Sequence, residues 1–156
     1  MAKTLTLGIS TSSGQFALVL GEAGKLLYHS NQGGEEPGKK EVHTMLVEGL
    51  NHLQRTVHDI GLIVTDIGPG GTSCVRTGVS FVNSLSFSID IPVAAVASFE
   101  LAGADVFGRT GLPVICTVKS IKENAFIGIY NGPQQYSIHF GKINELLPGL
   151  VNELET

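Results

Sequence analysis

The strongest candidate for a ligand-binding site in the sequence is one short segment, residues 68–78. It opens with four turn-forming residues, Gly68-Pro69-Gly70-Gly71, and continues Thr72-Ser73-Cys74-Val75-Arg76-Thr77-Gly78. A glycine-rich turn between a buried strand and a helix leaves backbone N–H groups free to bind an anion. The same glycines would also allow a tight strand-to-helix turn with no ligand, and the segment lacks the Gly-Lys-Ser/Thr ending of a P-loop.

Hydroxyl side chains after the first predicted strand join this loop as candidate anion-binding groups. The candidate set is Ser10, Thr11, Ser12, Gly68, Pro69, Gly70, Gly71, Thr72, Ser73, Arg76 and Gly78. Arg76 would meet a ligand anion or would pair with Asp66 or a carbonyl near the turn, and we favour the structural role. Cys74 lies where a helix N-terminus lowers a thiol pKa. No His or Asp is placed by sequence to activate it, so a nucleophilic cysteine is disfavoured.

Three histidines raise the question of a metal site. His43, His52 and His58 are spaced by nine and six residues. A compact helical metal pair needs a spacing of about four. We therefore expect solvated or interface histidines and no metal ion.

The hydrophobic pattern predicts the elements that position these residues. Polar–apolar alternation predicts strands, a continuous β-prone run predicts a strand covered on both faces, and apolar residues at helical spacing predict helices. Thr72 or Ser73 is expected to cap the second helix and Ser98 the third. In chain order the predicted elements are strands 4–10, 15–20 and 25–30, an exposed loop 31–40, helix 41–57, strand 59–67, a helix ending at about 88, strand 91–97 and helix 98–106.

This order predicts an α/β fold with a mixed sheet and flanking helices, the layout of the ribonuclease H-like or actin-like ATPase (ASKHA) lobe. After residue 108 the pattern restarts, with strands 113–119, 124–130 and 135–140 and a helix 144–154 interrupted by Pro148. We therefore predict an actin-like lobe at 1–108 and a truncated second lobe of the same type at 109–156.

Composition narrows the function classes. The chain has 156 residues with 42% hydrophobic and 15% charged residues, which suits a globular protein with a real core. The net charge of −4 and the scattered Lys and Arg residues argue against direct nucleic-acid binding. With no predicted signal peptide or membrane span, and with Cys74 and Cys116 expected to be reduced thiols, we expect a cytoplasmic protein.

The glycine-rich segment resembles the Gly-Pro-Gly-Ser-Phe-Thr-Gly-Val-Arg-x-Gly signature of the TsaB family, a YeaZ-like, glycoprotease-like group. The matching positions are Gly68, Pro69, Gly70, Val75, Arg76 and Gly78. Residues 91–100 are similar to the family's Ile-Pro-Val-x-Gly-Val-Ser-Ser-Leu-Glu segment, and His43-Thr44 to its helix opening. The resemblance covers roughly residues 4–130.

This resemblance implies a non-catalytic subunit in threonylcarbamoyladenosine (t6A) modification of tRNA. The expected partners are a TsaD-like catalytic subunit and a TsaE-like ATPase, with a homodimer when the chain is alone. ATP or ADP would bind only at a partner interface, and no other cofactor is expected. The alternatives are a diverged homodimeric paralogue without a tRNA role and a weak nucleotide-binding enzyme of the actin-like superfamily.

Two departures from the family pattern argue against catalysis. The family's first strand usually ends Ile-Asp-Thr-Ser, and this chain has Ser10 at the acidic position. The second lobe's first strand commonly ends Ile-Asp-Ala-Arg, and here Lys119 replaces the acid. Neither a zinc motif nor a catalytic triad supports peptidase activity. We therefore expect a shortened, divergent pseudo-enzyme.

The predicted interface lies on two helices. On the second helix, small residues beside exposed phenylalanines suit close helix-to-helix contact. The alternative is that the phenylalanines pack under loops or the second lobe. Together with the helix at 41–57, the predicted interface residues are His43, Val47, Leu50, Phe81, Ser84, Phe87 and Ser88.

Overall fold

The computed structural model describes residues 4–30, 41–120 and 122–154, and the predicted loop at 31–40 lies outside them. The chain forms two compact units. Unit 1 takes in the chain up to Ile67 together with Thr72–Val96, and unit 2 takes in Gly68–Gly71 and the chain from Ala97 onward. The lobe boundary predicted at 108/109 falls one helix later than this division, because the helix Ser98–Thr110 groups with unit 2.

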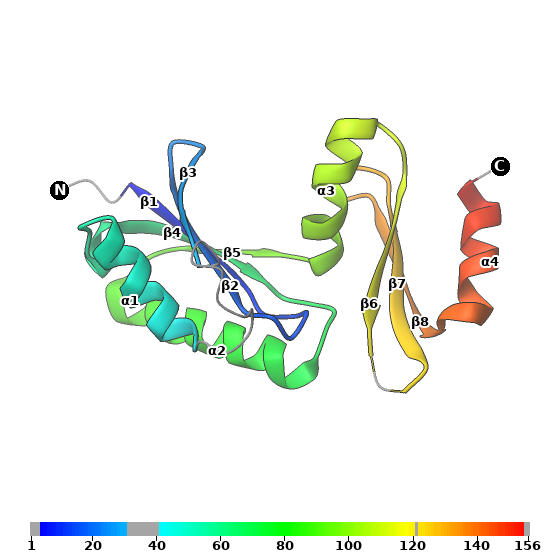
Figure 1. Cartoon of the computed structure of the whole chain (residues 1–156), viewed down its shortest axis with the longest axis horizontal. Helices are drawn as coiled ribbons and strands as arrows, with labels where there is room; N and C mark the ends of the chain where they lie inside the picture. Colours follow the sequence, from blue (N-terminus) through cyan, green and yellow to red (C-terminus); the bar gives the residue numbers. More distant parts are fainter. Residues whose placement is uncertain (1–3, 31–40, 121, 155–156) are drawn as a thin grey trace. The chain divides into compact units, whose positions relative to one another are not determined.

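Unit 1 is a five-stranded mixed sheet with helices (Figure 1). The strand order is β3-β2-β1-β4-β5. β1, β2 and β3 form an antiparallel meander, and β4 and β5 continue the sheet in parallel with β1, which confirms the predicted mixed sheet. Its elements are β1 (Leu5–Ser10), β2 (Ala17–Glu22), β3 (Lys25–His29), α1 (Val42–His52), a 3-10 turn η1 (Val57–Asp59), β4 (Ile60–Asp66), α2 (Thr72–Ile89) and β5 (Val93–Val96).

The core of unit 1 lies between one face of this sheet and the helices α1 and α2. Alternate residues of β1, Leu5, Leu7 and Ile9, are at most 4% exposed because they point to that face. In Figure 1 both helices run along the same side of the sheet. The buried side chains that join β1 in one cluster are Leu18, Leu20, Tyr28, Val42, Met45, Leu46, Leu50, Ile60, Ile63, Val82 and Ile91.

The predicted helix at 41–57 is wrong at its C-terminal end, because α1 stops at His52. Gln54 has a positive φ of 54°, which breaks the helix, and Thr56 then starts η1. Leu53 and Val57 still pack against the core, so the apolar periodicity continued past the helix itself.

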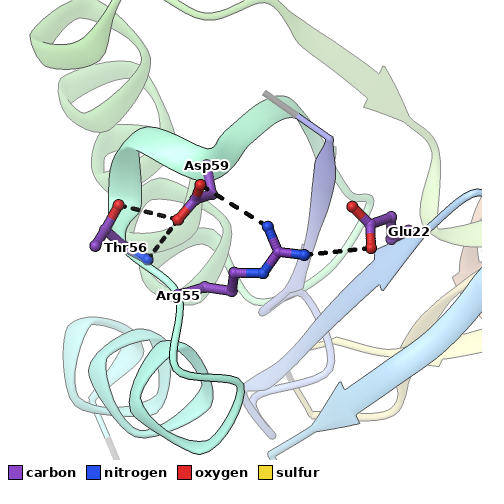
Figure 2. Close-up of polar contacts among 4 residues, drawn as sticks. All are labelled: Glu22, Arg55, Thr56 and Asp59. Carbon is purple, nitrogen blue, oxygen red and sulfur yellow. Dashed lines mark hydrogen bonds and ion pairs between the residues drawn. The ribbon is translucent and has the colours of Figure 1, made fainter. Parts of the chain in front are cut away.

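A polar network fixes the turn that leads into β4 (Figure 2). The Thr56 backbone N–H donates to the Asp59 carboxylate at 2.8 Å, and the Thr56 hydroxyl donates to the same oxygen at 3.0 Å. Arg55 lies between Asp59, at 3.9 Å, and Glu22 of β2, at 3.6 Å. These contacts form a capping box and tie the start of β4 to the end of β2.

The start of β2 and the cap of α3 also differ from the prediction. β2 begins two residues late, at Ala17, because the turn after β1 closes with a bond from the Gly14 N–H to the Thr11 carbonyl. Ser98 does not cap α3: the N-cap is Ala97, in an extended conformation and without a side-chain bond.

Unit 2 is a three-stranded antiparallel sheet, in the order β6-β7-β8, between two helices. Helix α3 packs on β6 and β7, and α4 packs on β7 and β8. The helix α4 continues through Pro148, so the predicted interruption is wrong; Pro148 and Asn144, whose carbonyl loses its partner, are both exposed to water. The elements are α3 (Ser98–Thr110), β6 (Val114–Lys119), β7 (Asn124–Tyr130), β8 (Tyr136–Lys142) and α4 (Ile143–Leu154).

The two faces of the second sheet are buried by different helices. On one face Ala125, Ile127 and Ile129 pack with Leu150 of α4. On the other face the Cys116 thiol lies against the backbone of Phe99 in α3, and burial raises the pKa of this thiol. None of the described helices is long and apolar enough to cross a membrane.

Candidate site at the carboxyl ends of strands β1 and β4

The polar cluster of unit 1 lies where β1 and β4 end. Because Ile9 pairs with Thr65 in parallel register, the next residues, Ser10 and Asp66, are neighbours at the edge of the sheet. The Ser10 hydroxyl donates to Oδ2 of Asp66 at 2.8 Å, and the Ser12 hydroxyl donates to the same oxygen. Asp66 is 2% exposed, so two serines from the β1 end hold a buried carboxyl group on β4.

Thr11 connects the same loop to the first turns of α2. Its buried hydroxyl donates to the Cys74 carbonyl at 2.8 Å. Its side chain also lies where a Cβ at Gly78 would be, so only glycine lets α2 approach this closely. Gly78 therefore has a packing role that its place in the sequence motif did not reveal.

These hydroxyl groups are better placed to hold the loops together than to bind an anion. Each of the three hydroxyls, on Ser10, Thr11 and Ser12, donates to an oxygen of the protein. A phosphate would have to displace these bonds and would lie beside the carboxyl group of Asp66, which repels an anion when it is ionised. The described geometry offers one carboxyl group and three hydroxyls with internal partners.

The glycine-rich loop itself belongs to unit 2. Gly68 is buried with a φ of 91°, a conformation that favours glycine, and its carbonyl accepts a bond from the Ser98 N–H at 2.8 Å. Pro69 and Gly70 are half-buried and Gly71 is exposed.

The residues after the loop start α2 in unit 1. Thr72 and Ser73 are exposed there. Arg76 is exposed too, and within the described ranges no ion pair joins it to Asp66. Of the sequence-predicted anion site, Gly68–Gly71 thus belong to unit 2 and the other residues to unit 1.

Most of the predicted interface residues lie on the outer surfaces of α1 and α2. Phe87 is 91% exposed, and Val47 is 53% exposed. Ser84 and Ser88 are exposed, and their hydroxyls donate to carbonyls one turn earlier at 2.9 and 2.7 Å. Because these hydroxyls are bonded to their own helix, this surface of α2 is less polar than its composition suggests.

Two predicted interface residues, Leu50 and Phe81, differ from the prediction. Leu50 is 7% exposed and belongs to the buried core, and Phe81 packs against that core. Both side chains therefore support unit 1 from inside, which corrects their assignment to an outer face. His43 is exposed and lies 3.2 Å from Glu41.

Sequence reasoning missed Asp66 as a member of the cluster. The signal for Asp66 was present, since an acidic residue that ends a buried strand needs partners for its carboxyl group. Thr65 is 4% exposed and its hydroxyl oxygen has no partner in the described structure, which no sequence pattern indicated. Among the described residues no three His, Cys, Asp or Glu side chains lie together as metal ligands would.

Comparisons with known proteins agree with this fold. The sequence model of the TsaD family, described as tRNA N6-adenosine threonylcarbamoyltransferase, matches residues 37–144, well over half of the chain. The chain belongs to this family. The fold of unit 1 and the family match together confirm the predicted ribonuclease H-like, actin-like class.

Within the TsaD family the chain is TsaB/YeaZ-like, as the resemblance predicted. It is 31% identical over 99 residues to the tRNA threonylcarbamoyladenosine biosynthesis protein TsaB of Bacillus subtilis, an alignment that covers 64% of this chain and 40% of that protein. YeaZ from Pseudomonas aeruginosa matches with a TM-score of 0.68 and 18% identity, over 87% of this chain and 64% of YeaZ.

A second solved structure from Pseudomonas aeruginosa, of a protein with similarity to the peptidase YeaZ, matches with a TM-score of 0.72 and 18% identity. It covers 89% of this chain and 67% of that protein. The chain thus spans 40% of the length of its TsaB relative and about two thirds of the two solved structures.

Proposed function

We propose that this chain is a non-catalytic partner subunit in t6A modification of tRNA, which pairs with a TsaD-like catalytic subunit through the outer faces of α1 and α2. The observation that carries the proposal is the exposed surface of α2 on a TsaB-like fold. Phe87 is 91% exposed, and such a large aromatic group on a helix gains most from burial against a partner.

The residues around Phe87 suit the close approach of another helix. Ser84 and Ser88 flank it on α2 with short side chains that are already hydrogen-bonded. Short side chains let helix axes come near one another, and an aromatic residue then fills the space between them. Val47, 53% exposed on α1, adds a second apolar group.

A non-catalytic role is supported by the cluster at the end of β1. The position where the TsaB pattern carries an acid is Ser10, and its hydroxyl is bonded to Asp66. The corresponding acid of the second lobe is replaced by Lys119. An enzyme of this superfamily needs carboxylates that face a metal–nucleotide complex, whereas the carboxyl group of Asp66 is turned to the serines of its own fold.

The test is light scattering after size exclusion, on the chain alone and mixed with the TsaD-type subunit of the same genome. We expect a heterodimer, and we expect Phe87→Asp to abolish it, because a carboxylate would be desolvated at the contact. Phe140→Asp is the matched control: Phe140 is 57% exposed on β8 of unit 2 and should leave the heterodimer intact.

Two results would overturn the proposal. One is a heterodimer that Phe87→Asp does not weaken. The other is a homodimer that ignores the TsaD-type subunit, which would identify a self-associating paralogue outside t6A synthesis.

A further inference from the structure

The two halves of α2 are held against unit 1 by different kinds of contact. The α2 side chains that join the apolar core of unit 1 all lie in the C-terminal half of the helix: Phe81, Val82, Leu85 and Ile89. In the first turns, from Thr72 to Thr77, no described residue is buried. Apolar packing therefore holds the second half of the helix more firmly than the first.

Thr11, in the loop after β1, contacts the first half of α2 at two points. This residue is 1% exposed, and its hydroxyl donates to the Cys74 carbonyl at 2.8 Å. One turn later its side chain fills the space beside Gly78, where an added Cβ would collide with it. The bond and the packing together hold two successive turns of α2 against the end of β1.

The loop that carries Thr11 is itself bonded on both sides of this residue. The hydroxyls of Ser10 and Ser12 both donate to Oδ2 of Asp66, which is buried at the end of β4. The Thr11 carbonyl accepts a bond from the Gly14 N–H at 3.1 Å. Because buried, fully bonded polar networks are rigid, this loop is a fixed support for the helix.

The helices of the proposed partner surface rest on different strands of the sheet. α1 packs on β2 and β3, whereas α2 packs on β4 and β5. Figure 1 shows both helices on the same side of this sheet. The outer residues Val47 on α1 and Phe87 on α2 therefore keep a constant spacing only if each helix is held on its own strands.

A movement at the start of α2 would change this spacing. At 1.5 Å per residue, Cys74 lies about 12 Å before Val82 along the helix axis, and Phe87 lies about 7.5 Å after it. If the helix pivots about the buried Val82, a displacement of about 1 Å at Cys74 moves Phe87 by about 0.6 Å the other way. Binding groups must be held to within about 0.5 Å of their productive positions.

We infer that Thr11 is a positioning residue for the partner surface of α2, and that Asp66 supports it through Ser10 and Ser12. The inference rests on the proposed pairing with a TsaD-like subunit through α1 and α2. At 1% exposed, Thr11 is buried beneath the helix and acts through α2. The polar cluster at the ends of β1 and β4 thus sets the affinity for the partner from inside unit 1.

Isothermal titration calorimetry with the TsaD-type subunit of the same genome tests this role. Thr11→Val keeps the shape of the side chain and removes the hydrogen bond to Cys74, so the affinity should fall about tenfold. Thr11→Ser keeps the hydroxyl and should restore the affinity to within about threefold of that of the unchanged chain.

Two control variants separate positioning from stability. Asp59→Asn removes the capping box at the start of β4, far along the strand from Asp66, and lowers the stability of unit 1. Thr65→Val changes another buried threonine, whose hydroxyl has no partner among the described residues. Both variants should bind the TsaD-type subunit as tightly as the unchanged chain does.

Hydrogen exchange of the chain alone measures the support of α2 without the partner. In Thr11→Val the amides of residues 76–80 should exchange at least about tenfold faster than in the unchanged chain. The amides of residues 84–88 should exchange at the same rate in both, because Val82, Leu85 and Ile89 still hold the second half of the helix.

Failure of this inference and failure of the proposed function give different results. If Phe87→Asp abolishes the heterodimer but Thr11→Val binds with unchanged affinity, the pairing stands and the positioning role is wrong. If the unchanged chain does not bind the TsaD-type subunit, the proposed function is wrong and the inference is overturned with it. Unchanged exchange of residues 76–80 in Thr11→Val also overturns the positioning role, whatever the affinity.

Discussion

Unit 1 and unit 2 each contain three successive antiparallel strands followed by a helix, α1 in unit 1 and α4 in unit 2, yet they bury the first of these strands to different degrees. In β1 the inward residues Leu5, Leu7 and Ile9 are at most 4% exposed. In β6 Ile115 remains half-buried. The cause is the neighbouring strand, because β4 and α2 cover the far side of β1 and no described strand does so for β6.

The difference shows what each part of this fold contributes. Three strands and a helix create a core that is open at one side, and a parallel strand followed by a helix closes it. The parallel strand also delivers Asp66 and the start of α2 to the end of β1, so the polar cluster exists only in the closed unit. The strand β4 therefore both completes the core of unit 1 and contributes Asp66 to the site.

The largest predicted effect is the difference in lost stability between an alanine substitution of Ile9 on β1 and one of Ile115 on β6. Ile9→Ala should destabilise unit 1 by about 4 kcal/mol, because it leaves a cavity in a closed core. Ile115→Ala should cost unit 2 only about 1 kcal/mol, since half of that side chain already contacts water. Hydrogen exchange of each unit in increasing urea, at concentrations where the chain is monomeric, measures both. Equal losses would contradict the comparison.

The next largest predicted effect on stability comes from substituting one helix glycine in each unit, Gly78 in α2 and Gly108 in α3. A Cβ at Gly78 would collide with Thr11, so Gly78→Ala should destabilise unit 1 by about 2 kcal/mol despite its better helix propensity. No atom lies within 4 Å of a Cβ at Gly108 in α3, and there Gly108→Ala should stabilise the helix by about 0.5 kcal/mol. Urea unfolding followed by circular dichroism distinguishes the two signs, and a gain at Gly78 would show that α2 is not held against the β1 loop.

Among the described residues, the Thr65 hydroxyl is a buried side-chain polar group of unit 1 without a hydrogen-bond partner. Thr65→Val keeps the shape of the side chain and removes the desolvated oxygen, so it should stabilise unit 1 by about 1 kcal/mol. Thr117→Val at the exposed position on β6 should change the stability of the monomer by less than about 0.5 kcal/mol. The urea midpoints of the two variants measure this, and a loss at Thr65 would mean that its hydroxyl has a partner in solution.

The smallest effect concerns two aspartates and pH. Bonds from the Thr56 backbone N–H and then its hydroxyl, with the charge of Arg55, hold the pKa of Asp59 below its ordinary value of 3.8. The stabilisation is therefore present above the unfolded pKa and is lost as the pH falls through the lower, folded value. Asp59→Asn should lower the urea midpoint at pH 7 and should lower it by less near pH 2.

Asp105 is the control for this measurement. It forms an exposed ion pair with Arg109 on α3, at 2.6 Å, and exposed pairs of this kind contribute little. Asp105→Asn should leave the midpoint nearly unchanged at both pH values. If Asp59→Asn changes the urea midpoint as little as Asp105→Asn does, the capping box does not help to position β4.

The sequence predicted the strands of unit 1 well because their burial produces strong patterns. β1 alternates, and β4, with partners on both sides, has no polar side chain before Thr65. The predicted end of α1 was wrong because Leu53 and Val57 keep the helical spacing although they lie beyond the helix and still pack against the core. A one-dimensional pattern records which side chains are buried and does not record whether the backbone between them is helical.

The site was predicted less completely, for a different reason. The glycine-rich motif identified Gly68 and Gly78 as members of the candidate site. The motif did not show that Asp66 accepts hydrogen bonds from the hydroxyls of Ser10 and Ser12, because these contacts join residues more than fifty positions apart in the sequence. Phe81 and Phe87 also could not be separated by pattern, since each has small polar neighbours on the helix and only packing shows that Phe81 faces the core.

The proposal that this chain is a partner subunit is tested most directly by t6A formation in a reconstituted reaction. The mixture contains the TsaD-type subunit, the remaining components of the modification machinery from the same genome, and tRNA, and t6A is quantified by mass spectrometry of nucleosides. We predict modification when the chain is present, loss of modification with Phe87→Asp, and full modification with Phe140→Asp. Equal amounts of t6A with and without the chain would contradict the account.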